Sequence, residues 1–294
     1  MDTKQFIPSL SALAHLRLVF SFFLFPVFLF ALSQTPVVNM SQAFLIFFIW
    51  HFLAFPASNG YNSYFDKDEK SIALLEKPPE VDLSLYYFSL LLEIAAFVLS
   101  FFISWWFAIA VLIYGMISKM YSHPSIRLKK YPFISFLVVF FFQGIFFYWS
   151  TYFALVDIDP FTGSLGHQII AGAICSCLIG ASYPLTQIYQ HEEDRKRGDH
   201  TLSLLLGYKG SFLFSGGLFI AGLILTFFYW KSSGSLTNFY LFLICIAPIF
   251  IFFTWWFYKT VQNTIYASFK NAMRMVFISS ICMVIYFGML VWMR

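Results

Sequence analysis

The sequence has 294 residues, of which 60% are hydrophobic and only 11% are charged, and its formal net charge is +4. A soluble domain carries about 25% charged residues, so this composition excludes a soluble globular enzyme, a disordered chain and a disulfide-rich secreted domain. It indicates an all-α protein that crosses a membrane several times.

Nearly continuous apolar runs, such as 133–147 and 239–253, also exclude a membrane β-barrel, whose strands alternate apolar and polar residues. All four cysteines lie inside apolar runs, which predicts buried small side chains and neither disulfides nor a zinc site. These cysteines are Cys175, Cys177, Cys245 and Cys282.

Nine segments are long and apolar enough to be predicted as membrane helices, forming a bundle around a central cavity. The third and fourth share one run, 83–118, that would be far longer than a bilayer as a single helix, so we place a break near Ser104. The nine segments are 10–32, 40–57, 85–103, 105–121, 133–155, 167–189, 211–230, 236–258 and 272–293.

Basic residues gather in alternate connections, which predicts the orientation of the chain. The opposite connections and the C-terminus carry only Lys231 and Arg294. Since Lys and Arg stay on the cytoplasmic side, we expect a cytoplasmic N-terminus and an external C-terminus. The positive net charge is thereby explained by topology and gives no indication of nucleic-acid binding.

Two segments on the predicted cytoplasmic side, 58–84 and 190–210, hold ten of the 14 acidic residues. Asn62 and Asp66 are four residues apart, so they share one face if the second helix continues. Gln190 and Asp194 repeat this spacing at the end of the sixth span. Carboxylate and amide oxygens suit Mg²⁺, which also binds substrate phosphates. The alternative is that these are ordinary charged loops in solvent.

A third segment on the same side, 121–130, is basic and includes Tyr121, Arg127 and Lys129. Arg and Lys bind phosphate groups well, Arg through its two-pronged guanidinium and Lys as a point charge. The alternative is that these cations only set the topology.

Together, the three segments resemble the UbiA superfamily of intramembrane prenyltransferases. That family has an Asn-x-x-x-Asp-x-x-x-Asp motif after its second helix, an Asp-x-x-x-Asp-Arg-x-x-Gly-Asp-x-Thr pattern after its sixth, and Tyr-Ser-x-x-x-x-Arg-x-Lys between its fourth and fifth. The chain departs at two positions, because Lys70 and Gln190 stand where the family has Asp. The matching residues are Asn62, Asp66, Tyr121, Ser122, Arg127, Lys129, Asp194, Arg195, Gly198, Asp199 and Thr201.

The resemblance implies Mg²⁺-dependent transfer of a prenyl group from an isoprenoid diphosphate to a hydrophobic acceptor, an aromatic or lipid-pathway compound, within the membrane. It implies an active site on the cytoplasmic side of a bacterial-type inner membrane. Catalysis would depend on Asn62, Asp66 and Asp194. The implied metal ligands are Asn62, Asp66, Asp68, Glu69, Gln190, Glu193 and Asp194, and the implied substrate-binding residues are Tyr121, Arg127, Lys129, Arg195 and Asp199.

Three other functions remain open: an intramembrane terpene cyclase that ionises the same diphosphate, a transporter, and a lipid-binding protein with a decayed site.

Glu93 lies deep in the third span, where it would pair with His51 or His15 or contact the acceptor. We expect residues 1–294 to form one domain. The two acidic clusters begin 128 residues apart, at Asn62 and Gln190. This spacing suggests an internal repeat of four and four helices, followed by a last helix.

Overall fold

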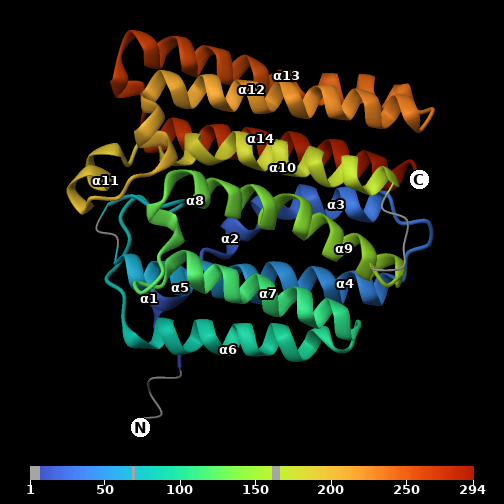
Figure 1. Ribbon diagram of the computed structural model, residues 1–294, viewed down its shortest axis with the longest axis horizontal. Helices are drawn as coiled ribbons and strands as arrows, with labels where there is room; N and C mark the ends of the chain where they lie inside the picture. The colour runs from blue at the N-terminus through green and yellow to red at the C-terminus, as the bar shows by residue number, and fades with distance from the viewer. Residues whose placement is uncertain (1–6, 68–69, 161–165) are drawn as a thin grey trace. The chain divides into compact units, whose positions relative to one another are not determined.

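The computed structural model describes residues 7–67, 70–160 and 166–294, and these residues form helices joined by short connections (Figure 1). No β-strand occurs among them, and one isolated bridge joins Ile72 to Leu75. The all-α prediction is therefore confirmed for this part of the chain.

Eight helical segments of the described chain are long and apolar enough to cross a membrane, and they coincide with eight of the nine predicted spans. The remaining prediction, 105–121, corresponds to α7 (Trp105–Ser122), an 18-residue helix that is not among the eight. The count of nine spans and the cytoplasmic N-terminus stay predictions.

Internal contacts divide the chain into two compact units. The first bundle comprises Met1–Phe22, Thr35–Lys129 and Phe153–Phe161, and the second comprises Phe23–Gln34, Lys130–Tyr152 and Thr162–Arg294. The single-domain expectation and the internal repeat stay predictions.

The first bundle consists of the early helices of the chain, the helix α5 that carries the first acidic motif, and the neighbouring helices α6 and α7. Within it, α5 packs against both α6 and α7 (Figure 1). Its elements are α1 (Leu10–His15), α2 (Leu18–Ser21), α4 (Met40–Phe48), the π-helical η3 (Ile49–Ala54), α5 (Phe55–Asp66), α6 (Leu83–Ser100) and α7.

The second bundle is built around α10, which packs along α12. The 3-10 segments η2 and η4 and the helix α9 run across the boundary between the units. The elements are η2 (Phe22–Leu24), α3 (Phe25–Ser33), η4 (Leu128–Lys130), α8 (Pro132–Val139), the π-helical η5 (Phe140–Phe146), α9 (Phe147–Val156), α10 (Gly166–Gln187), α11 (His191–Arg197), α12 (Leu202–Ser232), α13 (Leu236–Gln262), η6 (Thr264–Tyr266) and α14 (Phe269–Trp292).

The predicted break in the long apolar run 83–118 is confirmed at Ser104. This residue has extended backbone angles and is the N-cap of α7, where its Oγ accepts a hydrogen bond from the Phe107 amide at 3.2 Å. A serine oxygen at this position satisfies one of the amide groups that the first turn of a helix leaves without a partner.

A sharp bend at Gly207 divides α12 into a short and a long part. Gly207 has φ 67° and ψ 179°, a combination that essentially only glycine adopts. In a straight helix Ser203 and Ser211 would lie about 12 Å apart along the axis. At the bend their hydroxyl oxygens are 2.9 Å apart and share a hydrogen bond. We call this bend, with Ser203 and Ser211, the α12 elbow.

We expect Gly207→Ala to destabilise the protein by about 1–3 kcal/mol, since a side chain strains this backbone conformation. A Cβ at Gly207 would meet no atom within 4 Å, so the loss would reflect the backbone alone. The measurement is the thermal unfolding midpoint of the purified protein in detergent.

Gly217→Ala is the matched control, because Gly217 also has open space around it and lies in the same helix without a positive φ. An alanine there should raise stability by roughly 0.5–1 kcal/mol. Equal shifts in the two variants would contradict the assignment of strain to Gly207.

Candidate functional site

The first acidic motif lies on the last two turns of α5, where the predicted side-by-side placement of Asn62 and Asp66 is confirmed. Asn62 Nδ2 donates hydrogen bonds to Asp66 Oδ2 at 2.9 Å and to Ser122 Oγ at 3.0 Å. Both amide hydrogens are thereby used, which leaves the Asn62 carbonyl oxygen as the atom available to a ligand. The motif is helical, not part of a loop as the segment 58–84 suggested.

Lys129 forms an ion pair with the other Asp66 oxygen, Oδ1. The two side chains are only 14% and 12% exposed, so water screens the pair weakly. Lys129 reaches this place because the chain turns sharply after α7. Arg127 has a left-handed φ of 48°, and its amide donates to the His123 carbonyl at 2.8 Å. We call Asn62, Asp66, Ser122 and Lys129 the first half-site.

The other predicted residues of this region lie in the chain segments next to the first half-site. Tyr121 and Arg127 are half-buried and lie in the segment that leads to Lys129. Lys67 ends α5 with a left-handed φ of 48°, and Lys70 is exposed. Asp68 and Glu69, two of the expected metal ligands, lie outside the described residues.

The second acidic motif folds into α11 and the turn that follows it. Asp194 Oδ2 accepts a hydrogen bond from Thr201 Oγ1 at 2.9 Å, and the Asp199 amide donates to the Asp194 carbonyl at 2.9 Å. Thr201 is also the N-cap of α12. The motif residues Asp194, Asp199 and Thr201 therefore form one closed turn.

Gln190 differs from the sequence expectation, which placed it at the end of the sixth span. That span, α10, ends at Gln187, and Gln190 is the N-cap of the separate helix α11. The relation to Asp194 survives in the backbone, because the Asp194 amide donates to the Gln190 carbonyl at 2.9 Å. Glu193 lies within α11 and is half-buried, whereas Arg195 is exposed. We call Gln190, Glu193, Asp194 and Thr201 the second half-site.

No pattern in the sequence predicts the buried hydrogen bonds that anchor α11. His191 Nε2 lies 2.8 Å from Ser203 Oγ, and the His191 ring stacks on Tyr208 with centroids 4.6 Å apart. Gln187 Oε1 accepts from the Ser203 amide at 3.3 Å. The first residue of the acidic helix is therefore bound at the α12 elbow, which fixes where the carboxylates of α11 begin.

Burial lowers the pKa of His191 to about 4, and the positive charge of Arg195 acts in the same direction. His191 is consequently neutral near pH 7, and only one of its ring nitrogens carries a hydrogen. A neutral imidazole can hydrogen-bond to a serine hydroxyl at this buried position without the cost of a buried charge.

Glu93 does not pair with either histidine, so that part of the expectation was wrong, and its contact with the acceptor stays a prediction. Its partner is Lys119 of α7. His51 Nδ1 bonds to the Ser21 carbonyl at 2.9 Å, and His15 Nε2 to the Pro79 carbonyl at 2.7 Å. An ammonium group on the neighbouring helix neutralises the carboxylate, whereas both imidazole rings are bonded to backbone carbonyls.

The donor atoms of the half-sites fit Mg²⁺ in kind, since each offers carboxylate and amide oxygens. Among the described residues, no group of three His, Cys, Asp or Glu side chains lies close enough to hold a metal ion. Mg²⁺ often uses only one or two carboxylates and completes its shell with water and substrate phosphates. Neither half-site therefore needs three carboxylates to be a suitable ligand set.

Comparison with known proteins gives the same family as the motifs. A model of the UbiA prenyltransferase family matches residues 22–281. No curated protein matches the chain in sequence.

Several solved structures share the fold. A UbiA homolog from Archaeoglobus fulgidus bound to GPP and Mg²⁺ is 16% identical over 96% of this chain and 99% of its own, with a TM-score of 0.68. The same homolog bound to DMAPP and Mg²⁺ is 17% identical over 97% and 100%, with a TM-score of 0.66. A digeranylgeranylglyceryl phosphate synthase structure is 19% identical over 96% of each chain, with a TM-score of 0.61.

The family model covers well over half of the sequence and includes all three motifs. The described part of the chain contains eight helices long and apolar enough to cross a membrane, and the protein is an integral membrane protein that belongs to the UbiA prenyltransferase family.

Proposed function

We propose that the protein transfers a prenyl group from an isoprenoid diphosphate to a hydrophobic acceptor inside the membrane, with Mg²⁺ as the cofactor. The observation that carries this proposal is the first half-site. It holds the Asp66 carboxylate and the Asn62 side-chain amide of α5 together with the ammonium of Lys129, which comes from the segment after α7. Relatives bound to GPP or DMAPP with Mg²⁺ support the same substrate class.

In this proposal each half-site supplies metal ligands. Asn62 and Asp66 supply one set of oxygens, and Gln190, Glu193 and Asp194 supply the other, with Asp68 and Glu69 as further candidates. Mg²⁺, when bound, offsets the negative charge of the diphosphate and so makes it a better leaving group.

The cations of the chain act on the same leaving group. Arg127, Lys129 and Arg195 stabilise the charge that develops on the diphosphate when the allylic carbon–oxygen bond breaks. Tyr121 and Asp199 complete the substrate contacts. The remaining prenyl cation needs dry, electron-rich walls, and a chain with 22% aromatic residues supplies such faces readily.

The acceptor is proposed to be an aromatic or lipid-pathway compound that enters from the bilayer. The distribution of Lys and Arg supports a site at the cytoplasmic face, and we propose that the membrane is a bacterial-type inner membrane. A terpene cyclase would use the same ionisation without an acceptor, so product analysis separates the two.

We expect the purified protein to release pyrophosphate from GPP or DMAPP when Mg²⁺ and a membrane-soluble acceptor are present. Asp66→Ala and Asp194→Ala should each lower the rate by about 10²-fold or more, because each removes an oxygen ligand. A cyclic hydrocarbon formed from prenyl diphosphate alone would instead favour the cyclase.

Asp157→Asn is the control for this experiment, because Asp157 is exposed and lies outside both half-sites. It should release pyrophosphate at the wild-type rate. Wild-type rates in both alanine variants would refute the proposed site.

Lys129→Met should change the binding of metal and of diphosphate in opposite directions. Without its ammonium, Asp66 loses a competing cation, so Mn²⁺ used as a probe should bind more tightly in the absence of diphosphate. Pyrophosphate should bind about tenfold more weakly, because a charge-assisted contact is lost. Titration calorimetry of the two ligands measures both effects.

Lys130→Met is the matched control, since Lys130 is the exposed neighbour and lies over the Tyr131 ring at 5.1 Å. It should leave both affinities unchanged. An equal loss of pyrophosphate affinity in the two variants would show that general attraction by the basic segment, not the position of Lys129, is responsible.

A further inference from the structure

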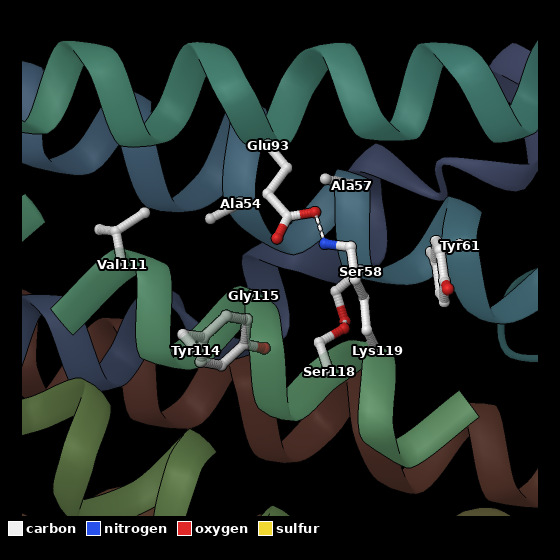
Figure 2. Close-up of a pocket in the computed structure, with 10 residues that line it drawn as sticks. All are labelled: Ala54, Ala57, Ser58, Tyr61, Glu93, Val111, Tyr114, Gly115, Ser118 and Lys119. Carbon is white, nitrogen blue, oxygen red and sulfur yellow. Dashed lines mark hydrogen bonds and ion pairs between the residues drawn. The ribbon is translucent and has the colours of Figure 1, made fainter. Parts of the chain in front are cut away.

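The ion pair between Glu93 and Lys119 has no part in the proposed chemistry, yet it lies inside the first bundle next to the first half-site. Figure 2 shows Glu93 reaching from α6 toward the ammonium of Lys119 on α7, beside Tyr61 and Ser58 of α5. The two side chains are 21% and 30% exposed. Ionisable groups on apolar helices are costly, so each strongly requires the other.

Gly115 lets the Glu93 carboxylate lie directly against the backbone of α7. A Cβ at Gly115 would be 2.1 Å from Glu93 Oε1 and 2.9 Å from Glu93 Cδ, distances that real side chains do not tolerate. Gly115 and Lys119 are one helical turn apart. The carboxylate therefore contacts α7 at two successive turns. These contacts set both the rotation of α7 and its position along the helix axis relative to α6.

Two hydrogen bonds then join α7 to α5. Ser118 Oγ donates to Ser58 Oγ at 2.6 Å, and Asn62 Nδ2 donates to Ser122 Oγ at 3.0 Å. The partners advance by four residues on both helices, so the bonds lie on facing sides of two helices that run in the same direction. We call these two bonds the α5–α7 ladder.

The ion pair and the ladder are adjacent in the chain and in space. Lys119 follows Ser118 directly, and its ammonium lies 5.5 Å from the centroid of the Tyr61 ring, next to Asn62 in sequence. A hydrogen bond of this kind keeps its length within about half an ångström. A shift of α7 by one residue, about 1.5 Å, would break both bonds of the ladder.

We propose that Glu93 and Lys119 are positioning residues for the first half-site. By fixing α7 against α6 and α5, they place Ser122 where it holds the amide of Asn62, and so orient the Asn62 carbonyl oxygen. The inference depends on the proposed function only for what the half-site binds. Its geometric part, that the ion pair sets the register of the ladder, stands independently.

Cross-linking tests the geometric part. The pair S58C and S118C, introduced into the full-length protein in detergent, should form a disulfide on oxidation, identified by mass spectrometry of the linked peptides. Adding Glu93→Gln should lower the cross-linked fraction. Gly115→Ala should do the same without removing a charge, because it displaces the carboxylate, and this provides a second variant if Glu93→Gln does not fold.

Met116→Ala is the matched control for cross-linking, because Met116 lies on α7 and is 54% exposed. It should leave the cross-linked fraction unchanged. Undiminished cross-linking in Glu93→Gln and Gly115→Ala would overturn the proposal.

Mn²⁺ binding by the full-length protein tests whether the register reaches the half-site. Glu93→Gln and Ser122→Ala should each weaken Mn²⁺ affinity by roughly tenfold, as the loss of a supporting residue does at other metal sites. If Glu93 acts through Ser122, the double variant should bind no more weakly than Ser122→Ala. Lys119→Arg, which keeps the charge, should retain affinity that Lys119→Met loses.

Additive losses in the double variant would overturn the positioning role, because a general loss of stability adds to the effect of Ser122 whereas a shared route does not. The outcome is separable from the proposed function. If Asp66→Ala leaves Mn²⁺ affinity unchanged, the metal assignment fails, and the cross-linking result alone decides whether the ion pair sets the α5–α7 ladder.

Discussion

A carboxylate on an apolar helix needs a cation within reach, and in this protein that requirement determines how α5, α6 and α7 fit together. Asp66 is paired with Lys129, and Glu93 with Lys119. Each pair connects a helix to a segment distant in sequence. Because lipid offers no alternative partner, such pairs select one arrangement of the helices much more strongly than similar pairs would in water.

The second bundle also holds its acidic motif in place, but with neutral groups instead of ion pairs. There a backbone bend at Gly207 brings two serine hydroxyls together, and a neutral histidine binds to them. These contacts fix the position at which α11 begins. The Asp194 carboxylate of that helix is then held by its hydrogen bond from Thr201. Ion pairs in one bundle and a buried hydrogen-bonded bend in the other thus serve one purpose, which is to hold an acidic motif at the end of an apolar span.

Much of this could be predicted from the sequence because it depends on local physics. Span length follows from hydropathy, the break at Ser104 from the length of the run, and the neighbouring positions of Asn62 and Asp66 from helical periodicity. The partner of Glu93 was predicted wrongly, because it depends on how α6 and α7 rotate against each other. No periodic pattern marks a pair such as Ser118 and Ser58, since serine is common and neutral.

The bend at Gly207 shows a second limit of prediction. A glycine within an apolar run has several structural roles, and only its backbone angles reveal which one it has. The same holds for Gln190. Its spacing to Asp194 was predicted correctly, but the helix to which it belongs was not. Spacing survives a change of element when the backbone bond from i+4 to i is kept, as it is here.

Both carboxylates of the family motif already have partners within their own bundle. Asp66 is held by Asn62 and Lys129, and Asp194 by Thr201. At Asp66 a bare divalent ion therefore competes with an ammonium group, which opposes its binding. Under the proposed function, a diphosphate removes this opposition, because it offers Lys129 a new anionic partner as it brings its own oxygens to the metal. That proposal therefore expects the half-site to bind metal and diphosphate together more strongly than either alone, which would limit occupation by metal when no substrate is present.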